Sequence, residues 1–578
     1  MLKTSDIKEN NKIRIMLGQI NFIVGDLRGN QIKINEIVEI AQKNEIDLLV
    51  FPEMALTGYP IQDLIFDRDF FESEQKILKE IAKTFPDITL IIGGFNIESD
   101  PNHHPQYQNV AFVLSKGEIS NIYSKRLIPT YDVFDEKRYF WEGENFLPYT
   151  IKGLKFGIAI CEDLWEKEYQ LNVAEKLVEN GAEVIISING SPYIIGKQKI
   201  RENLIKQKAL EYKIPIAYLN LIGGEDELVF DGRSFVLDKH GRLTHRASFC
   251  KESLIFFEIS TKTREINYID HSSLKLIPKR YEYDVINPIS DLFNENEEIV
   301  QAMAMNLRDY FYKTGIFNRI VVGLSGGIDS AFTTYISVKA VGKEKVTAIL
   351  MPSRFSSQGS LDDSIELCKN LDIEYIIFSI KDSHLLLENQ LQNTLKGEYS
   401  EQDNDIANQN LQSRLRGIIL MYYSNKFKAL LVSTGNKSEI ATGYCTLYGD
   451  TNGGKNVPGD LYKTQLYRVV NWINKNNEVI PINIVNKPPS AELKENQIDE
   501  DNLPPYKDLD EILALRIDEG LSPREIIKLG KDPNLVFYIE RLYSKSEFKR
   551  AQLVQTIKIN KKAFGMGRKI PILKKPSY

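Results

Sequence analysis

The segment 319–338, RIVVGLSGGIDSAFTTYISV, constrains the fold of this chain more than any other part of the sequence. An apolar, β-rich run leads into a glycine-rich loop, and the loop leads into a stretch typical of a helix. Glycines let a backbone approach phosphate oxygens, and a helix N-terminus adds partial positive charge. The segment therefore predicts a strand, a loop suited to pyrophosphate and a helix. The GxxxxGK[ST] and GxGxxG loops do not occur in the sequence.

The residues around this segment alternate between short apolar runs and longer runs of helical period. We expect strands at RIVVGL, KVTAILM, EYIIFSI and ALLVST, and helices at 296–313, 328–341, 361–370 and near 406–427. Such alternation is typical of a parallel, doubly wound sheet. The polar stretches 396–405 and 450–459 are predicted to be loops over a site.

The first half of the chain shows a second α/β series. Strands are expected at IRIMLGQI, DLLVFPE, TLIIGGF, NVAFVL, LKFGIAI, EVIISI and IPIAYLN, and helices at 28–43 and 197–213. A chain of 578 residues is too long for one core, because domains usually hold about 100–200 residues. We predict a first domain at 1–265, an irregular, proline-containing linker at 266–290 and a second domain at 291–578.

The composition narrows the class of protein. A hydrophobic content of 42% and a charged content of 26% are ordinary for a globular protein, and a net charge of −6 provides no basic field for nucleic acid or anionic membranes. The polar opening MLKTSDIKENNK and the lack of a long apolar run predict a cytoplasmic protein. The four cysteines have neither disulfide nor zinc spacing, so a special cysteine would be special for its reactivity.

Three residues of the first half suggest a thiol site. Cys161 follows the run LKFGIAI, Glu53 follows DLLVFP, and Lys125 follows a third β-rich run. A thiolate can attack an amide carbonyl, a carboxylate can take the thiol proton and return it to the leaving ammonia, and a cation can stabilise the oxyanion. A single cysteine, glutamate or lysine usually has only a structural role. The three together at strand ends favour amide hydrolysis.

At these residues the sequence resembles the nitrilase superfamily over about residues 13–260, which implies a four-layer α-β-β-α sandwich with Glu53, Lys125 and Cys161 as the catalytic triad. The stretch NLIGGEDELVFDGRS is similar to glutaminase domains of glutamine-dependent NAD synthetases. That resemblance implies glutamine contacts from Tyr131, Ser191 and Lys197. It also suggests that Glu136 orients Lys125, and the alternative is that the two residues form an ordinary ion pair at the surface. Glu225 and Arg233 depart from the family pattern and add charge near the expected pocket.

The loop SGGIDS resembles the ATP-pyrophosphatase group, which transfers AMP to an acceptor. NLQSRLRG, NKSEIATGYCTLYGD, GDLYKTQLY, KPPSAELKENQIDEDNLPPY and SEFKRAQ extend the resemblance to the NAD synthetase family across about 296–565. The resemblance implies ATP contacts from Gly323, Leu324, Ser325, Gly326, Gly327, Ile328, Asp329, Ser330, Thr434, Lys463 and Ser490. It implies deamido-NAD contacts from Asn410, Arg414, Glu439 and Lys549, and Mg²⁺ ligands at Asp329 and Glu439. Met566 stands where the family usually has a basic residue.

Together the two resemblances imply a homo-oligomeric enzyme that takes nitrogen from glutamine and amidates deamido-NAD with ATP and Mg²⁺. Ammonia made next to a channel would reach the second site in its neutral, nucleophilic form. One alternative is another amidotransferase, acting on aspartate or a purine, but Leu2 excludes a processed N-terminal cysteine, and none of the six histidines lies near Cys161 in sequence. A second alternative is a scaffold or sensor without turnover, although no triad or loop residue is missing.

Overall fold

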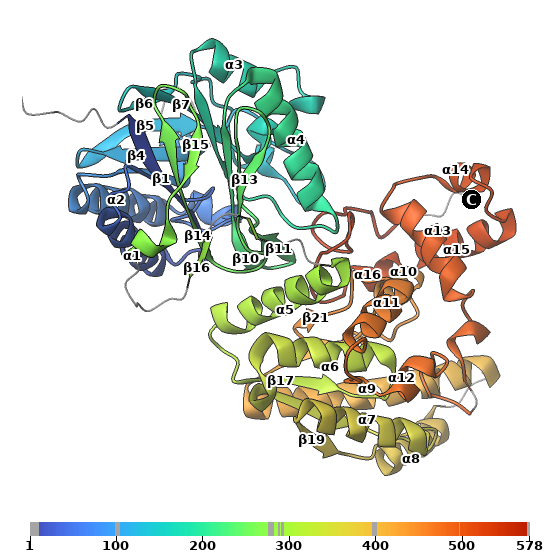
Figure 1. Ribbon diagram of the computed structural model, residues 1–578. Coiled ribbons are helices and arrows are strands. Elements are labelled where there is room, and N and C mark those ends of the chain that lie inside the picture. Colours follow the sequence, from blue (N-terminus) through green and yellow to red (C-terminus); the bar gives the residue numbers. More distant parts are fainter. Residues whose placement is uncertain are drawn as a thin grey trace, which may run out of the picture. The chain divides into compact units, whose positions relative to one another are not determined.

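The computed structural model describes residues 11–98, 105–275, 283–286, 289–290, 294–395, 401–495 and 497–574. The chain divides into two compact units: the first comprises residues 1–225 and 230–293, and the second comprises residues 226–229 and 294–578. In Figure 1 the first unit is coloured mainly blue to green and the second yellow-green to red. Neither unit is continuous in sequence, because a four-residue tip of the first half belongs to the second unit.

The first unit contains one large sheet of order β15-β14-β1-β2-β3-β4-β5, with β16 pairing with β14. Its central strands β1, β2 and β3 are parallel to one another, and β3, β4 and β5 are antiparallel. The strands are β1 (Lys12–Gln19), β2 (Leu48–Val50), β3 (Thr89–Glu98), β4 (Gln106–Ser115), β5 (Glu118–Ser124), β14 (Ser253–Ser260), β15 (Ile266–Tyr268) and β16 (Asp284–Ile286).

A second sheet of the same unit has the order β13-β12-β9-β8-β7-β6, and a separate hairpin is formed by β10 and β11. β7, β8 and β9 run parallel, so their C-terminal ends meet at one edge. The strands are β6 (Tyr149–Ile151), β7 (Leu154–Ile160), β8 (Val184–Asn189), β9 (Ile216–Asn220), β10 (Ile222–Glu225), β11 (Leu228–Asp231), β12 (Phe235–Leu237) and β13 (Leu243–Arg246).

The two sheets pack face to face over one apolar core. That core contains Ile15 and Leu17 of the first sheet together with Ile158 and Ile186 of the second, all with no exposed surface. Two helices accompany each sheet: α1 (Leu27–Lys43) and α2 (Arg68–Thr84) the first sheet, and α3 (Val173–Glu179) and α4 (Lys197–Tyr212) the second. α2 contacts β4 and β5, and α1 packs against α2, whereas α3 contacts β7 and α4 contacts β12. The predicted four-layer sandwich is confirmed.

The second unit is built on a parallel sheet of order β19-β18-β17-β20-β21. The order reverses next to β17, and in doubly wound sheets ligands bind at such a switch point, beyond the carboxyl ends of the strands. The strands are β17 (Arg319–Gly323), β18 (Val346–Leu350), β19 (Glu374–Ile377), β20 (Ala429–Ser433) and β21 (Lys455–Asn456). The predicted doubly wound sheet is confirmed.

Helices cover this sheet and form a C-terminal helical layer (Figure 1). A second apolar cluster joins α10 to the last helices through Ile440, Leu509 and Ile539. The helices are α5 (Glu295–Lys313), α6 (Ile328–Val341), α7 (Gln358–Leu371), α8 (Lys381–Thr394), α9 (Glu401–Phe427), α10 (Lys437–Thr442), α11 (Lys463–Ile473), α12 (Ile482–Asn486), α13 (Tyr506–Ile517), α14 (Pro523–Lys528), α15 (Pro533–Lys545) and α16 (Glu547–Arg550).

Two local predictions need adjustment. The stretch 396–405 was expected to be a loop, but α9 already begins at Glu401, and residues 396–400 lie outside the described part of the chain. Within the expected linker, β15 and β16 both pair with β14, because their backbone groups complete the edge of the large sheet. No helix among the described residues is long and apolar enough to cross a membrane.

Candidate functional site

Cys161 stands on a sharp turn at the end of β7. Its φ is 44°, a left-handed backbone conformation that is rare for a residue with a side chain. Asp163 holds the turn: its Oδ2 accepts from the backbone N–H of Ile160 at 3.0 Å and forms an ion pair with Arg126. Cys161 is 4% exposed and belongs to the core between the sheets. The turn therefore places the cysteine just beyond the end of β7, where it is almost fully buried.

Lys125 and Glu53 lie together in the interior of the first unit. Lys125 Nζ is 2.9 Å from Glu53 Oε1 and 2.9 Å from both carboxylate oxygens of Glu136, and neither Lys125 nor Glu53 has exposed surface. Tyr59 donates from its hydroxyl to Glu136 Oε1 at 2.9 Å. One cation is therefore held between two carboxylates, as expected if Glu136 orients Lys125.

The Glu53 carboxylate has two further donors that the sequence did not indicate. Asn109 Nδ2 donates to Oε1 at 2.7 Å, and the backbone N–H of Gly190 donates to Oε2 at 2.6 Å. Asn109 comes from β4, and Gly190 follows β8. Two sheets thus fix one carboxylate, so its orientation is determined by backbone positions and not only by its own rotamer.

The electrostatics of this cluster keep the thiol protonated. Burial raises the pKa of Cys161 well above its ordinary value, and the charge of Glu53 raises it further, whereas Lys125 opposes the effect. For Lys125, burial alone would lower the pKa, but the charges of Glu136 and Glu53 raise it well above normal. The lysine therefore stays cationic, and the cysteine needs a base when it reacts.

Two of the residues predicted to contact glutamine, Tyr131 and Lys197, lie near Glu162, the residue that follows the cysteine. Tyr131, which is 48% exposed, donates from its hydroxyl to Glu162 Oε2 at 3.0 Å, and Tyr169 donates to Glu162 Oε1 at 3.1 Å. Lys197 begins α4, its Nζ lies 4.2 Å from the centroid of the Trp165 ring, and its charge lowers the pKa of Glu162, which burial raises. Glu162 is a further polar group of this site.

Ser191 and Arg233 are buried in the same unit. Ser191 Oγ accepts from Arg201 Nε at 3.1 Å, and Arg201 forms an ion pair with Asp231 at 2.8 Å. Arg233 is 2% exposed, and its guanidinium lies 4.4 Å from the centroid of the Phe249 ring. The extra charge of Arg233 is therefore an interior group and not a surface substitution.

The SGGIDS loop of the second unit has the predicted strand, loop and helix. Gly326 has a φ of 81°, and a Cβ there would lie 2.5 Å from the carbonyl oxygen of Ser360, so only glycine fits. Ser330 Oγ lies 3.2 Å from Ser325 Oγ and donates to the carbonyl oxygen of Gly327. α6 begins directly after Gly327, so the loop lies at a helix N-terminus.

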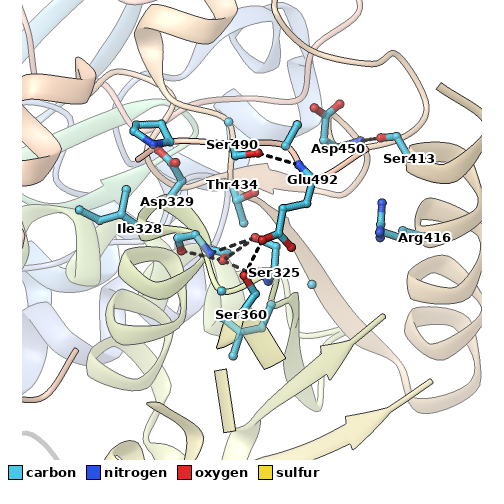
Figure 2. A pocket seen from close by; sticks show the side chains of 18 of the residues that line it. Ser325, Ile328, Asp329, Ser360, Ser413, Arg416, Thr434, Asp450, Ser490 and Glu492 are labelled. Carbon is cyan, nitrogen blue, oxygen red and sulfur yellow. Dashed lines mark hydrogen bonds between the residues drawn. The ribbon is translucent and has the colours of Figure 1, made fainter. Parts of the chain in front are cut away.

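This loop forms one wall of a pocket at the carboxyl ends of the strands. Figure 2 shows Ser325, Asp329, Thr434 and Ser490 around it. Every predicted ATP contact lines the same pocket: Gly323, Leu324, Ser325, Gly326, Gly327, Ile328, Asp329, Ser330, Thr434, Lys463 and Ser490. Arg416 and Glu492, which the sequence reasoning missed, also line it. Glu492 accepts from Ser357 and Ser360 hydroxyls and forms an ion pair with Lys487 at 2.5 Å.

Asp329 and Glu439 converge on one cation. Lys463 Nζ is 2.5 Å from Asp329 Oδ2 and 3.6 Å from Glu439 Oε1. Burial raises the pKa of Glu439 well above its ordinary value, and the neighbouring charge of Asp329 adds to this. In the part of the chain that the structure describes, no group of three His, Cys, Asp or Glu residues could hold a metal. Two carboxylates still fit Mg²⁺, which commonly takes one or two together with phosphate oxygens and water.

Asp510 of α13 links the helices that carry these groups. Ser438 Oγ donates to Asp510 Oδ1 at 2.5 Å and accepts from the backbone N–H of Lys463 at 3.0 Å. Asp510 Oδ2 accepts from the backbone N–H of Thr464 at 2.8 Å. One buried carboxylate therefore aligns α10, which bears Glu439, with the start of α11, which bears Lys463.

The remaining predicted contacts gather around residues 443–447, just after α10. Lys549 Nζ donates to the carbonyl oxygens of Gly443 and Cys445, both at 2.7 Å. Arg414 Nε donates to the carbonyl oxygen of Leu447 at 3.2 Å, and Asn410 Oδ1 accepts from the Thr446 hydroxyl at 2.7 Å. Two residues of α9 and the distant Lys549 thus contact one loop. The backbone N–H of Met566 donates to Glu227 Oε2 at 3.0 Å.

Comparison with known proteins finds a matching protein family for each half of the chain. The family model described as NAD synthase matches residues 299–553, and the one described as carbon-nitrogen hydrolase matches residues 14–268. Glutamine-dependent NAD(+) synthetase of Thermotoga maritima is 40% identical, with 97% of this chain and 98% of that protein aligned, and that of Synechocystis sp. is 38% identical, with 96% and 98% aligned.

A solved structure gives the same result. Glutamine-dependent NAD+ synthetase from Acinetobacter baumannii, determined in complex with adenosine diphosphate, has a TM-score of 0.75 and 33% identity, covering 97% of this chain and 98% of that chain. The chain is therefore a carbon-nitrogen hydrolase unit joined to an NAD synthase unit. It belongs to the family of glutamine-dependent NAD(+) synthetases.

Proposed function

We propose that this protein hydrolyses glutamine in its first unit and uses the ammonia in its second unit to convert deamido-NAD to NAD, with ATP cleaved to AMP and pyrophosphate. The observation that carries the proposal is that one polypeptide contains both a buried thiol, base and cation in its first unit and a glycine-lined phosphate pocket in its second unit. We assign residues 1–265 to the glutaminase domain, apart from the 226–229 tip that belongs to the second unit, and 291–578 to the synthetase domain. The linker 266–290 between them adds β15 and β16 to the sheet of the first unit.

In the first reaction, the sulfur of Cys161 forms a bond with the amide carbon of glutamine as its proton passes to Glu53. The carbon–nitrogen bond breaks as Glu53 returns that proton to the departing nitrogen, which leaves as ammonia. Water then hydrolyses the thioester to glutamate. Lys125 is fixed between two carboxylates and remains cationic, which suits stabilisation of the oxyanion.

Charge complementarity supports the assigned glutamine contacts. The α-amino group of glutamine is cationic and its α-carboxylate anionic. Glu162, held by Tyr131, can pair with the first, and Lys197 can pair with the second. Ser191 lies on the loop that also supplies the Gly190 N–H to Glu53, so binding and catalysis share one backbone segment.

In the second reaction, the carboxylate of deamido-NAD attacks the α-phosphorus of ATP, and pyrophosphate leaves. Ammonia then attacks the resulting acyl adenylate and AMP leaves. The SGGIDS loop and Lys463 neutralise phosphate charge, and Asp329 with Glu439 would hold Mg²⁺, whose charge polarises the phosphoryl oxygens. Asn410, Arg414, Glu439 and Lys549 are proposed to contact deamido-NAD around the 443–447 loop.

We also propose a homo-oligomer. β19 lies at one edge of its sheet, and Tyr375, Ile376, Ile377 and Phe378 are all exposed. An exposed apolar edge strand is unfavourable in water unless another chain covers it. Light scattering after gel filtration tests this proposal, and a monomer at micromolar concentration would refute it.

The test of the function is a mass-spectrometric assay with deamido-NAD, ATP and amide-¹⁵N glutamine. We expect NAD that carries ¹⁵N, with one AMP released for each NAD formed. Adenylation of aspartate or a purine precursor, with no reaction of deamido-NAD, would refute the choice of acceptor. Absence of AMP with every acceptor would refute the adenylating reaction.

A further inference from the structure

Asn109 is a buried amide directly before the apolar run Val110–Leu114 of β4. It lies within β4, opposite Phe95 of β3, and has no exposed surface. Side chains alternate along a strand, so Asn109 shares its face with Ala111 and Val113, which belong to the core between the two sheets. An uncharged polar group in such a core is costly unless its hydrogen bonds are made.

Asn109 contacts two members of the thiol site. Its Nδ2 donates to Glu53 Oε1 at 2.7 Å, and its backbone carbonyl oxygen accepts from the backbone N–H of Lys125 at 2.8 Å. Within the described residues its Oδ1 has no hydrogen-bond partner. Within the described residues, only the NH₂ group of the Asn109 side chain is therefore hydrogen-bonded, and its partner is the Glu53 carboxylate.

Asn44 shows what a structural amide in the same unit looks like. Its Nδ2 donates to the carbonyl oxygen of Ile40 at 2.8 Å, and its Oδ1 accepts from the backbone N–H of Lys275 at 2.7 Å. Both ends of that amide are bonded to backbone and hold the end of α1. Asn109 differs, because its side chain bonds to a catalytic group and leaves its acceptor unused.

The donors around Glu53 are unevenly shared between its two oxygens. Oε1 receives Asn109 Nδ2 and Lys125 Nζ, which fill the two acceptor sites of that oxygen. Among the residues that the structure describes, Oε2 receives the Gly190 N–H alone, so one acceptor site is left. A proton transferred to Glu53 therefore binds to Oε2.

We propose that Asn109 is a positioning residue for glutamine hydrolysis: by occupying Oε1 together with Lys125, it makes Oε2 the oxygen that exchanges the proton with Cys161. This role rests on the proposed function of Glu53 as the base. The thiol proton passes to Oε2 as the sulfur–carbon bond forms, and the same proton passes to the amide nitrogen as the carbon–nitrogen bond breaks.

Replacement of Asn109 by leucine removes the preference for Oε2 as the oxygen of Glu53 that takes the proton. In Asn109→Leu an acceptor site of Oε1 opens, so the proton can reside on the oxygen bonded to Lys125 and not on Oε2. A carboxylate with fewer donors also holds its proton more tightly. We expect kcat/KM for glutamine hydrolysis to fall about 10- to 100-fold, the range for losing a hydrogen bond to a charged group. The acidic limb of the pH profile should move to higher pH.

Asn109→Ser provides a graded comparison. Its hydroxyl can still donate, directly or through one water, so we expect a smaller loss, on the order of threefold, and a smaller shift of the acidic limb. The matched control is Asn44→Leu, which removes a buried amide without touching Glu53. It should lower the melting temperature and leave the pH profile unchanged.

The experiment compares glutamine hydrolysis from pH 5 to 9 and ammonia-driven NAD synthesis in the full-length wild type and the three variants, per folded enzyme. Ammonia-driven synthesis should be unchanged in all of them. An unmoved acidic limb with near-wild-type rates in both Asn109 variants would overturn the positioning role, as would a parallel loss of ammonia-driven synthesis. A wild type that does not hydrolyse glutamine would overturn the proposed function and this role with it.

Discussion

The thiol site of the first unit and the phosphate pocket of the second differ in how far their charged side chains are exposed to solvent. In the thiol site, Lys125 and Glu53 have no exposed surface and are fixed by side-chain and backbone donors. In the phosphate pocket, the Asp329 and Glu439 side chains are each 17% exposed, and glycines and hydroxyls form the wall. The first site must hold its reacting groups in fixed positions, whereas the second must admit a ligand that brings its own charge.

The two sites meet two different requirements of one reaction sequence: fixed positions for reacting side chains, and access from solvent for a phosphate ligand. Bond-making side chains need fixed geometry, so they are built from strand ends and paired inside a core. Binding of phosphate needs backbone N–H groups that can be reached from solvent, so it is built from a loop at a helix N-terminus. The variants below test whether the two sites are as independent as this suggests.

The largest expected effect is that of Cys161→Ala. Loss of the nucleophile should reduce glutamine-driven NAD synthesis by at least about 10⁴-fold and leave ammonia-driven synthesis unchanged. Parallel assays with glutamine and with ammonium chloride measure this. Cys368→Ala, which changes a buried cysteine of α7, is the control and should affect neither. Loss of both activities in Cys161→Ala would contradict separable sites.

Lys125→Met should affect stability as well as activity. It leaves Glu53 and Glu136 as two buried carboxylates without their cation, which costs about 3–5 kcal/mol. Lys463→Met in the second unit leaves two partly exposed carboxylates, so we expect about 1–2 kcal/mol, between the values for exposed and buried pairs. Differential scanning calorimetry of both variants measures this. Equal costs would mean that the two sites do not differ in burial as described.

Asp329→Asn should weaken the second reaction with either nitrogen source. Removal of one proposed Mg²⁺ ligand should lower AMP release at least about 100-fold, since a metal commonly contributes several kcal/mol of charge stabilisation. Glutamine hydrolysis in the absence of ATP should be unchanged. AMP release is measured against Mg²⁺ concentration, with Asp362→Asn on the exposed face of α7 as the control. Unchanged AMP production would remove the metal assignment.

Glu547→Gln should have the smallest effect, and one that depends on pH. Burial alone would raise the pKa of Glu547, but hydrogen bonds from Arg568 and Arg550 lower it to about 2. Because the pKa of Glu547 in the folded state lies below the ordinary value of about 4.3, ionised Glu547 stabilises the fold above that pH. This stabilisation is lost as pH falls toward 2. The variant should thus be less stable than wild type at pH 7, by about 1–2 kcal/mol. The difference should narrow below pH 4, as urea unfolding would measure. A difference that does not change with pH would refute this account.

Much of this architecture could be predicted from sequence because it depends on local patterns. The strand, loop and helix around SGGIDS follow from apolar runs, glycines and helical period, and Glu53, Lys125 and Cys161 were recognisable because each follows a strand. Asn109 could not be found this way. It lies inside β4 and not after the end of a strand, and its role depends on which strands are neighbours. Asp510 is similar, because its contacts join three helices whose packing no short pattern encodes.

The tip between β10 and β11 limits how the halves of this protein can be produced. Residues 226–229 belong to the second unit, where Asn306 Nδ2 donates to the carbonyl oxygens of Asp226 and Leu228, and the carbonyl oxygen of Glu227 accepts from the backbone N–H of Lys558. A fragment starting at 294 would lack these acceptors and leave buried donors unpaired. A synthetase fragment intended for crystallisation or screening should therefore carry the four-residue tip, supplied in trans or grafted through a short loop.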